Sequence, residues 1–132
     1  MATRAPQALR PCPLVRHVEV SSVTRPDQAL LYRLSGDRNP LHSDPEFARR
    51  GGFDKPILHG MCTYGVTGRL LIQAFAGGDP RKVKGMMARF TKPVIPGDTL
   101  TVQAWREGGA IRFRTLGAGG ATVLDFGTLT LV

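Results

Sequence analysis

The stretch GMCTYGVTGRLLIQAF, residues 60–75, decides the fold. Wound as a helix, it is apolar on nearly every side, which predicts a buried central helix. After it the chain changes to strand-like segments separated by PGD, GG and GAGG turns. These segments are KGMMARFTKPV (84–94), TLTVQAWRE (99–107), AIRFRTLG (110–117) and TVLDFGTLTLV (122–132). A buried helix with an antiparallel sheet of at least four strands predicts the α+β class.

Three further elements are expected before the central helix. VRHVEV (15–20) alternates apolar and polar residues, which is typical of a short strand. In SSVTRPDQALLYRLS, Pro26 suits the first turn of a helix that ends near Gly36. SDPEFARR (43–50) predicts a second short helix, capped by Ser43 or Asp44. The apolar face expected for the first of these helices consists of Ala29, Leu30 and Leu34.

Length and composition limit the class of protein. With 132 residues, 42% of them hydrophobic, the chain suits one globular domain. We expect a flexible, proline-bearing lead-in at 1–13 and one domain at 14–132. The sequence lacks both the run of about 20 apolar residues needed to cross a bilayer and a secretory signal. Cys12 and Cys62 are too few for a disulfide framework, so we expect a reducing compartment, the bacterial cytoplasm.

Because the formal net charge is +8, we expect an anionic partner. The basic residues are scattered and are not interleaved with aromatic side chains, which argues against nucleic acid. A ligand with a phosphate-bearing handle fits better. Candidate contacts are Arg89 and Lys92 in ARFTK, and Lys84 with its neighbours Arg81 and Lys82; a solvated face explains each of them equally well.

At YRLSGDRNPLHSDPEFA, residues 32–48, the sequence resembles the signature of the MaoC-like, (R)-specific enoyl-CoA hydratase family, also called hydratase 2. FDKPILHGMCTYG (53–65) and ARFTKPVIPGDTL (88–100) extend the likeness to the catalytic, C-terminal half of the hydratase 2 unit of peroxisomal multifunctional enzymes. The resemblance covers about residues 14–132. It implies a single hot-dog fold, in which an antiparallel sheet wraps a long central helix. It also implies reversible syn hydration of trans-2-enoyl-CoA to (R)-3-hydroxyacyl-CoA.

This reaction needs a base for the attacking water, a proton for C2 and a donor to the thioester oxygen. Asp37 and His42 are implied to share the proton chemistry; which of them is the base stays open. They are five residues apart, about 140° around a regular helix, so a turn must bring them together. Asn39, between them, is expected to hold the water or Asp37 through its amide.

The dipeptide His59-Gly60 opens the predicted central helix. The first N–H groups of a helix have no intrahelical acceptor and carry the positive end of its dipole. The resemblance implies that Gly60 donates such a hydrogen bond to the thioester oxygen. For His59 two interpretations remain: it shapes the substrate pocket, or it is a helix-start residue satisfied by the local backbone.

No metal and no cofactor beyond the coenzyme A of the substrate are expected. The three histidines, His17, His42 and His59, lack ligand spacing. Because a single hot dog leaves a sheet edge and one side of its helix uncovered, we expect a dimer, with an identical chain or with another hot-dog chain. Two alternative functions are a binding or catalytic subunit of a heteromeric hot-dog assembly and a dehydratase for acyl carrier protein thioesters.

Overall fold

The computed structural model describes residues 17–132, so the predicted lead-in and the first two residues of the predicted N-terminal strand lie outside the described chain. The helices are α1 (Gln28–Tyr32), α2 (Pro45–Arg50) and α3 (Gly60–Phe75). The strands are β1 (His17–Val23), β2 (Val83–Phe90), β3 (Thr99–Glu107), β4 (Ala110–Leu116) and β5 (Thr122–Leu131). Short 3-10 turns are η1 (Arg33–Ser35), η2 (Pro40–His42), η3 (Pro80–Lys82) and η4 (Ala118–Gly120).

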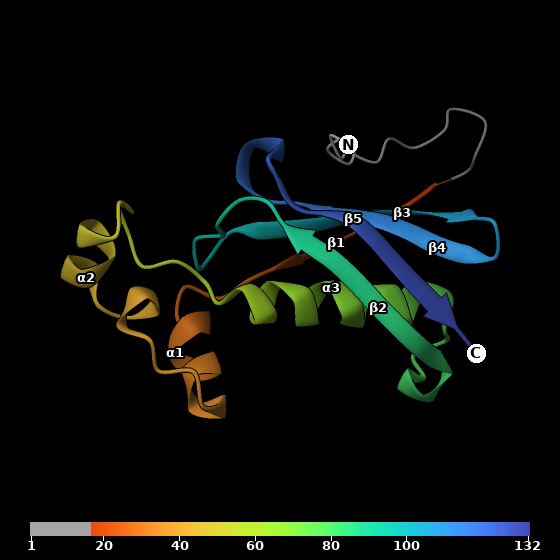
Figure 1. The fold of residues 1–132 in the computed structure, drawn as a ribbon, viewed down its shortest axis with the longest axis horizontal. Helices are drawn as coiled ribbons and strands as arrows, with labels where there is room; N and C mark the ends of the chain where they lie inside the picture. Colours follow the sequence, from red (N-terminus) through yellow and green to blue (C-terminus); the bar gives the residue numbers. More distant parts are fainter. Residues whose placement is uncertain (1–16) are drawn as a thin grey trace, which may run out of the picture.

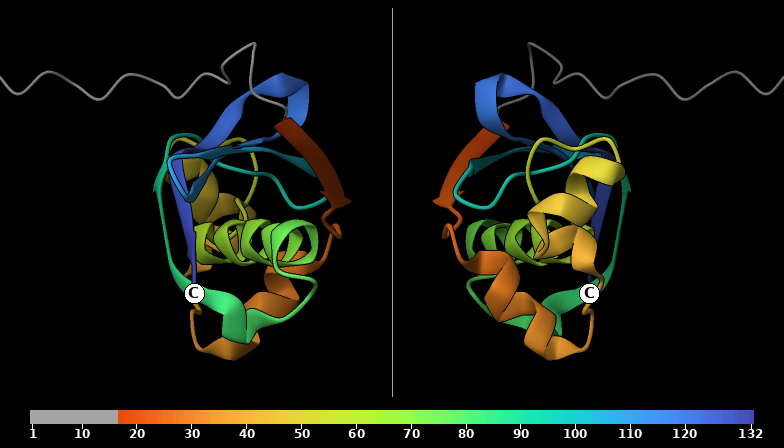
Figure 2. Two further views of the ribbon diagram at one scale, coloured as in Figure 1. Left: turned by 90° about the vertical axis from the view of Figure 1, so that its right-hand side faces the viewer. Right: turned by 90° about the vertical axis from the view of Figure 1, so that its left-hand side faces the viewer.

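The five strands form one antiparallel sheet in the order β1-β3-β4-β5-β2, and this sheet curls around α3 (Figures 1 and 2). Leu71 of α3 is fully buried against a cluster that includes Val102 on β3, Phe113 on β4 and Leu129 on β5. Alternate residues of β4 point to this core, as the period of a strand requires. The α+β class and the helix-and-sheet arrangement expected of a hot-dog fold are confirmed.

The ends of some elements differ from the prediction. β2 ends at Phe90, and the predicted strand does not reach residue 94, where Pro93 would have no N–H for the ladder. α1 begins at Gln28, after Pro26, and continues as η1 to Gly36, whose φ of 120° suits glycine. Asp44, and not Ser43, caps α2: its carboxylate accepts hydrogen bonds from two main-chain N–H groups of the first turn.

Several side chains predicted to be in the core are exposed. Leu30 and Leu34 of the expected face are 50% and 68% exposed, and only Ala29 is buried, because α1 and η1 touch the domain with one narrow side. Met87, on the edge strand β2, is also 67% exposed. The central helix is also not buried all round, since one stripe, residues Met61, Gly65, Arg69 and Gln73, faces outward. A five-stranded sheet therefore covers only part of α3.

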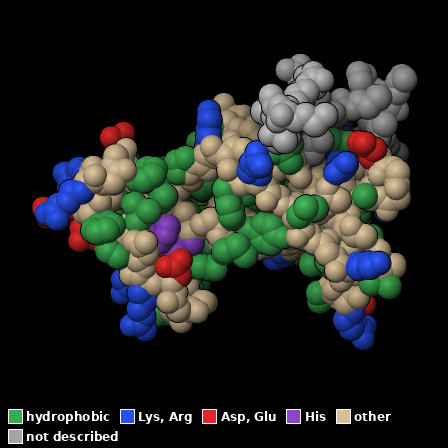
Figure 3. Space-filling model, viewed as in Figure 1, with side chains coloured by type: hydrophobic (Ala, Val, Ile, Leu, Met, Phe, Trp, Pro, Cys, Tyr) green, Lys and Arg blue, Asp and Glu red, His purple; other side chains and the backbone are tan. Residues whose placement is uncertain are grey.

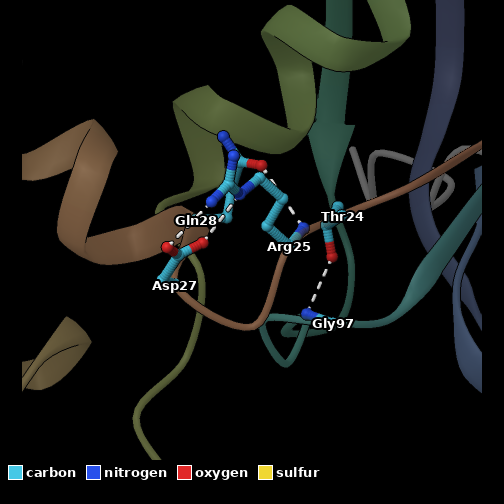
Figure 4. Close-up of polar contacts among 5 residues, drawn as sticks. All are labelled: Thr24, Arg25, Asp27, Gln28 and Gly97. Carbon is cyan, nitrogen blue, oxygen red and sulfur yellow. Dashed lines mark hydrogen bonds and ion pairs between the residues drawn. The ribbon is translucent and has the colours of Figure 1, made fainter.

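The connection from β1 to α1 is anchored to the turn before β3 (Figure 4). The buried hydroxyl of Thr24 donates to the carbonyl oxygen of Asp98 at 2.7 Å and accepts from the amide of Gly97 at 2.9 Å. An exposed ion pair between Arg25 and Asp27 follows at 2.9 Å. This anchor fixes the start of α1 and thereby places the turn after it beside the N-terminus of α3. Within residues 17–132, no helix has the length and apolar character to cross a bilayer.

Candidate active site

Two local hydrogen bonds shape the turn that contains Asp37 and His42. The amide of Asn39 donates to Oδ1 of Asp37 at 3.2 Å, and the amide of Leu41 donates to Oδ1 of Asn39 at 3.0 Å. Such bonds from Asp and Asn to the main chain two residues on are typical of tight turns. The turn brings Asp37 and His42 together with His59 so that one polar atom of each lies within 4.8 Å of the others. The sequence spacing did not indicate that His59 joins this group.

Asn39 has a structural part in addition to the one expected. Its side-chain oxygen caps η2 by accepting from Leu41, and the contact with Asp37 comes from its main-chain N–H. Through this oxygen the side chain holds the short η2 helix that carries His42. A carboxylate only accepts hydrogen bonds, so the predicted contact with the water or Asp37 would come from the side-chain NH2 group of Asn39, and that role stays a prediction.

The position of His42 fixes which of its ring nitrogens is available. Nδ1 lies 2.7 Å from the carbonyl oxygen of Ile57. A carbonyl only accepts, so Nδ1 carries the proton and Nε2 of the neutral ring carries the lone pair. The main chains of Leu41 and Ile57 are bonded as well, at 3.3 Å. His42 is therefore held as a group able to take a proton at Nε2.

His59 is 1% exposed and lies between the other two residues. Its Nε2 donates to the main-chain oxygen of Asp37 at 3.0 Å, and its ring stacks on His42 with centroids 3.8 Å apart and planes at 28°. Nδ1 is buried without a hydrogen-bond partner. Burial is the main cause that lowers the pKa of His59, so the ring is neutral at ordinary pH. The interpretation that the local backbone satisfies His59 is wrong, because the carbonyl bonded to its ring belongs to Asp37, 22 positions earlier.

Three ligand-type side chains this close raise the question of a metal ion. An imidazole coordinates through a lone pair in the plane of its ring. The rings of His42 and His59 are stacked with planes at 28°, so their in-plane lone pairs run side by side and do not converge on one point. Carbonyl oxygens also engage one nitrogen of each ring. The arrangement suits proton transfer next to a carboxylate better than coordination.

α3 begins at Gly60, as the sequence predicted. The amides of Cys62 and Thr63 donate to the carbonyl oxygen of His59. The amide of Gly60 is at the first helical position and has no acceptor within the helix. A Cβ at Gly60 would lie 3.0 Å from the ring of Phe90, so glycine allows this close packing. Gly60 and His42 line the same cavity.

This cavity has a volume of about 330 Å³. Its wall is mostly apolar, with Phe53 and Phe90 among the larger side chains, and polar groups occur at a few points. Figure 3 shows histidine atoms in a hollow of the surface, next to an acidic group and between apolar patches. A cavity with apolar walls and a few convergent polar groups is typical of a small-molecule site.

Of the predicted phosphate contacts, Lys92 alone is among the described residues that line the cavity. Arg89, on β2, lies over the ring of Phe126 with its guanidinium carbon 5.7 Å from the ring centre. Lys84 is six residues before Phe90 on the same strand, roughly 20 Å away. Arg81 and Lys82 lie in η3, beyond that far end, and Arg81 pairs with Asp79 at 3.0 Å.

A long helix wrapped by an antiparallel sheet, with an aspartate and a histidine close together at the helix N-terminus, defines a hot-dog domain with a candidate site at that end of the helix. The chain belongs to the MaoC-like domain family, whose model matches residues 10–125. This membership confirms the family that the signature at residues 32–48 indicated.

The relatives are enzymes or enzyme domains. The chain is 57% identical to 3-hydroxyacyl-thioester dehydratase Y of Mycobacterium tuberculosis, over 83% of this chain and 40% of that protein. All of it superposes on 25% of the peroxisomal multifunctional enzyme type 2 of Drosophila melanogaster, with a TM-score of 0.89 and 42% identity. An (R)-hydratase from A. caviae involved in PHA biosynthesis matches 94% of this chain and 100% of its own, with a TM-score of 0.72 and 27% identity. The chain thus spans less than half of the first two relatives.

The buried, neutral state of His59 predicts a pH-dependent stability. Its folded-state pKa lies below the ordinary value of 6.5 that applies to the unfolded chain. The ring therefore favours the folded state above pH 6.5, and this contribution is lost as the pH falls toward the folded-state pKa. Between about pH 7.5 and about pH 5, we expect the urea midpoint of the wild type to fall more than that of His59→Gln. Parallel pH dependences of the two proteins would contradict the assignment.

Proposed function

We propose that this chain catalyses the reversible syn hydration of trans-2-enoyl-CoA to (R)-3-hydroxyacyl-CoA. One observation carries the proposal: Asp37 and His42 are held together at the N-terminus of α3, and His42 shares a cavity with Gly60. An acid–base pair beside an unbonded helix amide is the set of groups that hydration of an unsaturated thioester requires. The relative from A. caviae, matched over its whole length, carries the printed name of (R)-hydratase.

In this mechanism the thioester carbonyl points to the amide of Gly60, and a water molecule lies between Nε2 of His42 and the carboxylate of Asp37. The water oxygen forms a bond to C3 while one of these groups takes its proton. The electron pair of the double bond moves toward the thioester oxygen, where the Gly60 N–H and the helix dipole stabilise the negative charge. C2 then receives a proton from the same pair. Since both steps occur on one face of the substrate, the addition is syn.

The remaining contacts follow from the cavity. Its apolar wall takes the enoyl-thioester part, and Lys92 at its lining meets a phosphate of coenzyme A. The residues present supply a base, an acid and an oxyanion donor, so the reaction requires no cofactor beyond the coenzyme A of the substrate. The mycobacterial relative supports the bacterial cytoplasm as the site of action.

A second hot-dog chain is proposed to complete the fold. The exposed stripe of α3 borders a hollow of about 430 Å³, to which Gly65, Gly68 and Met86 contribute. β2 lies beside it at the edge of the sheet, with β5 as its neighbour on one side. An uncovered helix face next to a free strand edge suits a partner of the same fold, either a second copy or a related chain.

A dehydratase for carrier-protein thioesters is the second candidate. The mycobacterial relative is named for a thioester without mention of coenzyme A, and the net charge of +8 would attract an acidic carrier protein. Dehydration of a 3-hydroxyacyl thioester would use the same proton transfers at Asp37 and His42 in the reverse direction. Turnover with carrier-protein substrates that falls with salt, while turnover with coenzyme A substrates does not, would favour this version.

Loss of either member of the acid–base pair should abolish most of the activity. We expect Asp37→Asn and His42→Ala each to lower kcat by about a hundredfold or more, because each removes proton transfer in the transition state. The assay follows the loss of enoyl-thioester absorbance with crotonyl-CoA and with a longer 2-enoyl-CoA. His17→Ala, an exposed histidine at the far end of β1, is the matched control. A wild type that is inert on both substrates, or two variants that retain full activity, would refute the proposal.

Lys92 and Lys84 form a matched pair for testing phosphate recognition. Lys92→Ala should raise KM for enoyl-CoA several-fold with little change in kcat, since it removes an interaction made equally in the ground and transition states. Lys84→Ala, at the other end of β2, should leave both constants unchanged. Equal KM values for the two variants would exclude Lys92 as the phosphate contact.

The partner surface can be blocked without disturbing the single domain. No atom lies within 4 Å of a Cβ built on Gly65, so Gly65→Glu fits the isolated fold and obstructs a chain packed on the stripe. Sedimentation should show a dimeric wild type, a monomeric Gly65→Glu and a dimeric Ala74→Glu, the control on the same helix. If Gly65→Glu is dimeric, the interface does not involve this stripe. If the purified wild type is monomeric, a homodimer is excluded.

A further inference from the structure

We propose that His59 is a positioning residue: it fixes Asp37 and His42 relative to each other and does not contact the substrate. The inference rests on the proposed hydratase reaction. It replaces the expectation that His59 binds substrate, and it gives a role to the one buried side-chain nitrogen that lacks a partner in the described chain.

The first contact joins the start of α3 to the catalytic turn. Nε2 of His59 lies 3.0 Å from the main-chain oxygen of Asp37. Because a carbonyl oxygen can only accept, the proton is on Nε2 and the tautomer of the neutral ring is fixed. Asp37 is exposed, its carboxylate accepts a local hydrogen bond from the amide of Asn39, and the bonds that join the turn to Ile57 lie at its other end, at Leu41 and His42. The bond from His59 ties this exposed turn to the buried helix.

The second contact orients His42. The two imidazole rings are stacked with centroids 3.8 Å apart, and Tyr32 lies against His59 at 4.6 Å with a tilt of 47°. The edge of His42 is fixed separately by the carbonyl of Ile57 at 2.7 Å. One constraint on its edge and one on its face leave the His42 ring little freedom, and Nε2 stays directed at the site of the water molecule.

The third observation is that His59 is inaccessible. It is 1% exposed. Neither His59 nor Asp37 is among the described residues that line the 330 Å³ cavity, but Asp37 is exposed, whereas His59 is closed off from solvent. Its Nδ1 has no partner, and a purely structural histidine would be expected to satisfy both nitrogens. A proton on this nitrogen would place an unpaired buried cation against His42, whereas the neutral ring accommodates a positive charge on His42 during turnover.

Two substitutions separate the two contacts. His59→Phe keeps a ring to stack on His42 and loses the bond to Asp37; His59→Gln keeps an N–H donor and loses the stack. We expect each to lower kcat about tenfold or more while KM changes less than about threefold, because misplaced reacting groups reduce the rate more than binding. His17→Phe should change neither constant. Urea midpoints of all proteins, measured in the same buffer, give the folded fraction.

Other outcomes overturn the inference. A raised KM with unchanged kcat would mean that His59 contacts the substrate. A fall in activity that matches the unfolded fraction would mean that its role is only structural. If one variant does not fold, the other decides.

If the wild type itself is inert, the proposed function fails, and the geometric inference is judged by two measurements that do not depend on activity. Imidazole nitrogen spectra of the wild type should show His59 as the Nε2–H tautomer. Hydrogen exchange of the amides of Asn39, Leu41 and His42 should be faster in His59→Phe than in His17→Phe. The other tautomer, or equal exchange, would overturn the inference.

Discussion

The burial of α3 inside the curled sheet is the constraint on which the rest of this structure depends. Leu71 and its neighbours are removed from water by strands that are far apart in the sequence, and apolar burial of this kind is the main favourable term in folding. Packing the helix also fixes its first turn in space. The amide of Gly60 and the ring of His59 are then fixed in position, and the turn that carries Asp37 and His42 packs against them.

The site combines a weakly supported segment with a strongly supported one. Asp37 and His42 belong to a polar, largely exposed turn, and such turns have low local stability. His59 belongs to the buried start of the helix. Two contacts across this boundary, a hydrogen bond and a ring stack, hold the exposed turn in the arrangement that the proposed acid–base reaction needs.

The chain leaves apolar surface uncovered in two places, and both have a physical explanation. A sheet of five strands does not enclose a helix completely, so the stripe through Gly65 and the edge of β2 stay open. The leucines of α1 and η1 are exposed because these short helices touch the domain through Ala29 alone among the residues of the predicted face. The basic residues behind the net charge of +8 are scattered along the sequence, and among the described cavity residues Lys92 supplies the basic group.

The sequence by itself determined the elements whose causes are local. The apolar run at 60–75, the alternating strands and the turn residues at 36–40 predicted α3, the sheet and the Asp37–His42 turn, because periodicity and turn chemistry act over a few residues. The tertiary structure alone decided which surfaces remain exposed, which cation reaches the cavity and that His59 stacks on His42. These features join segments 17 to 22 residues apart or more, and only the packing of α3 against the sheet brings such segments into contact.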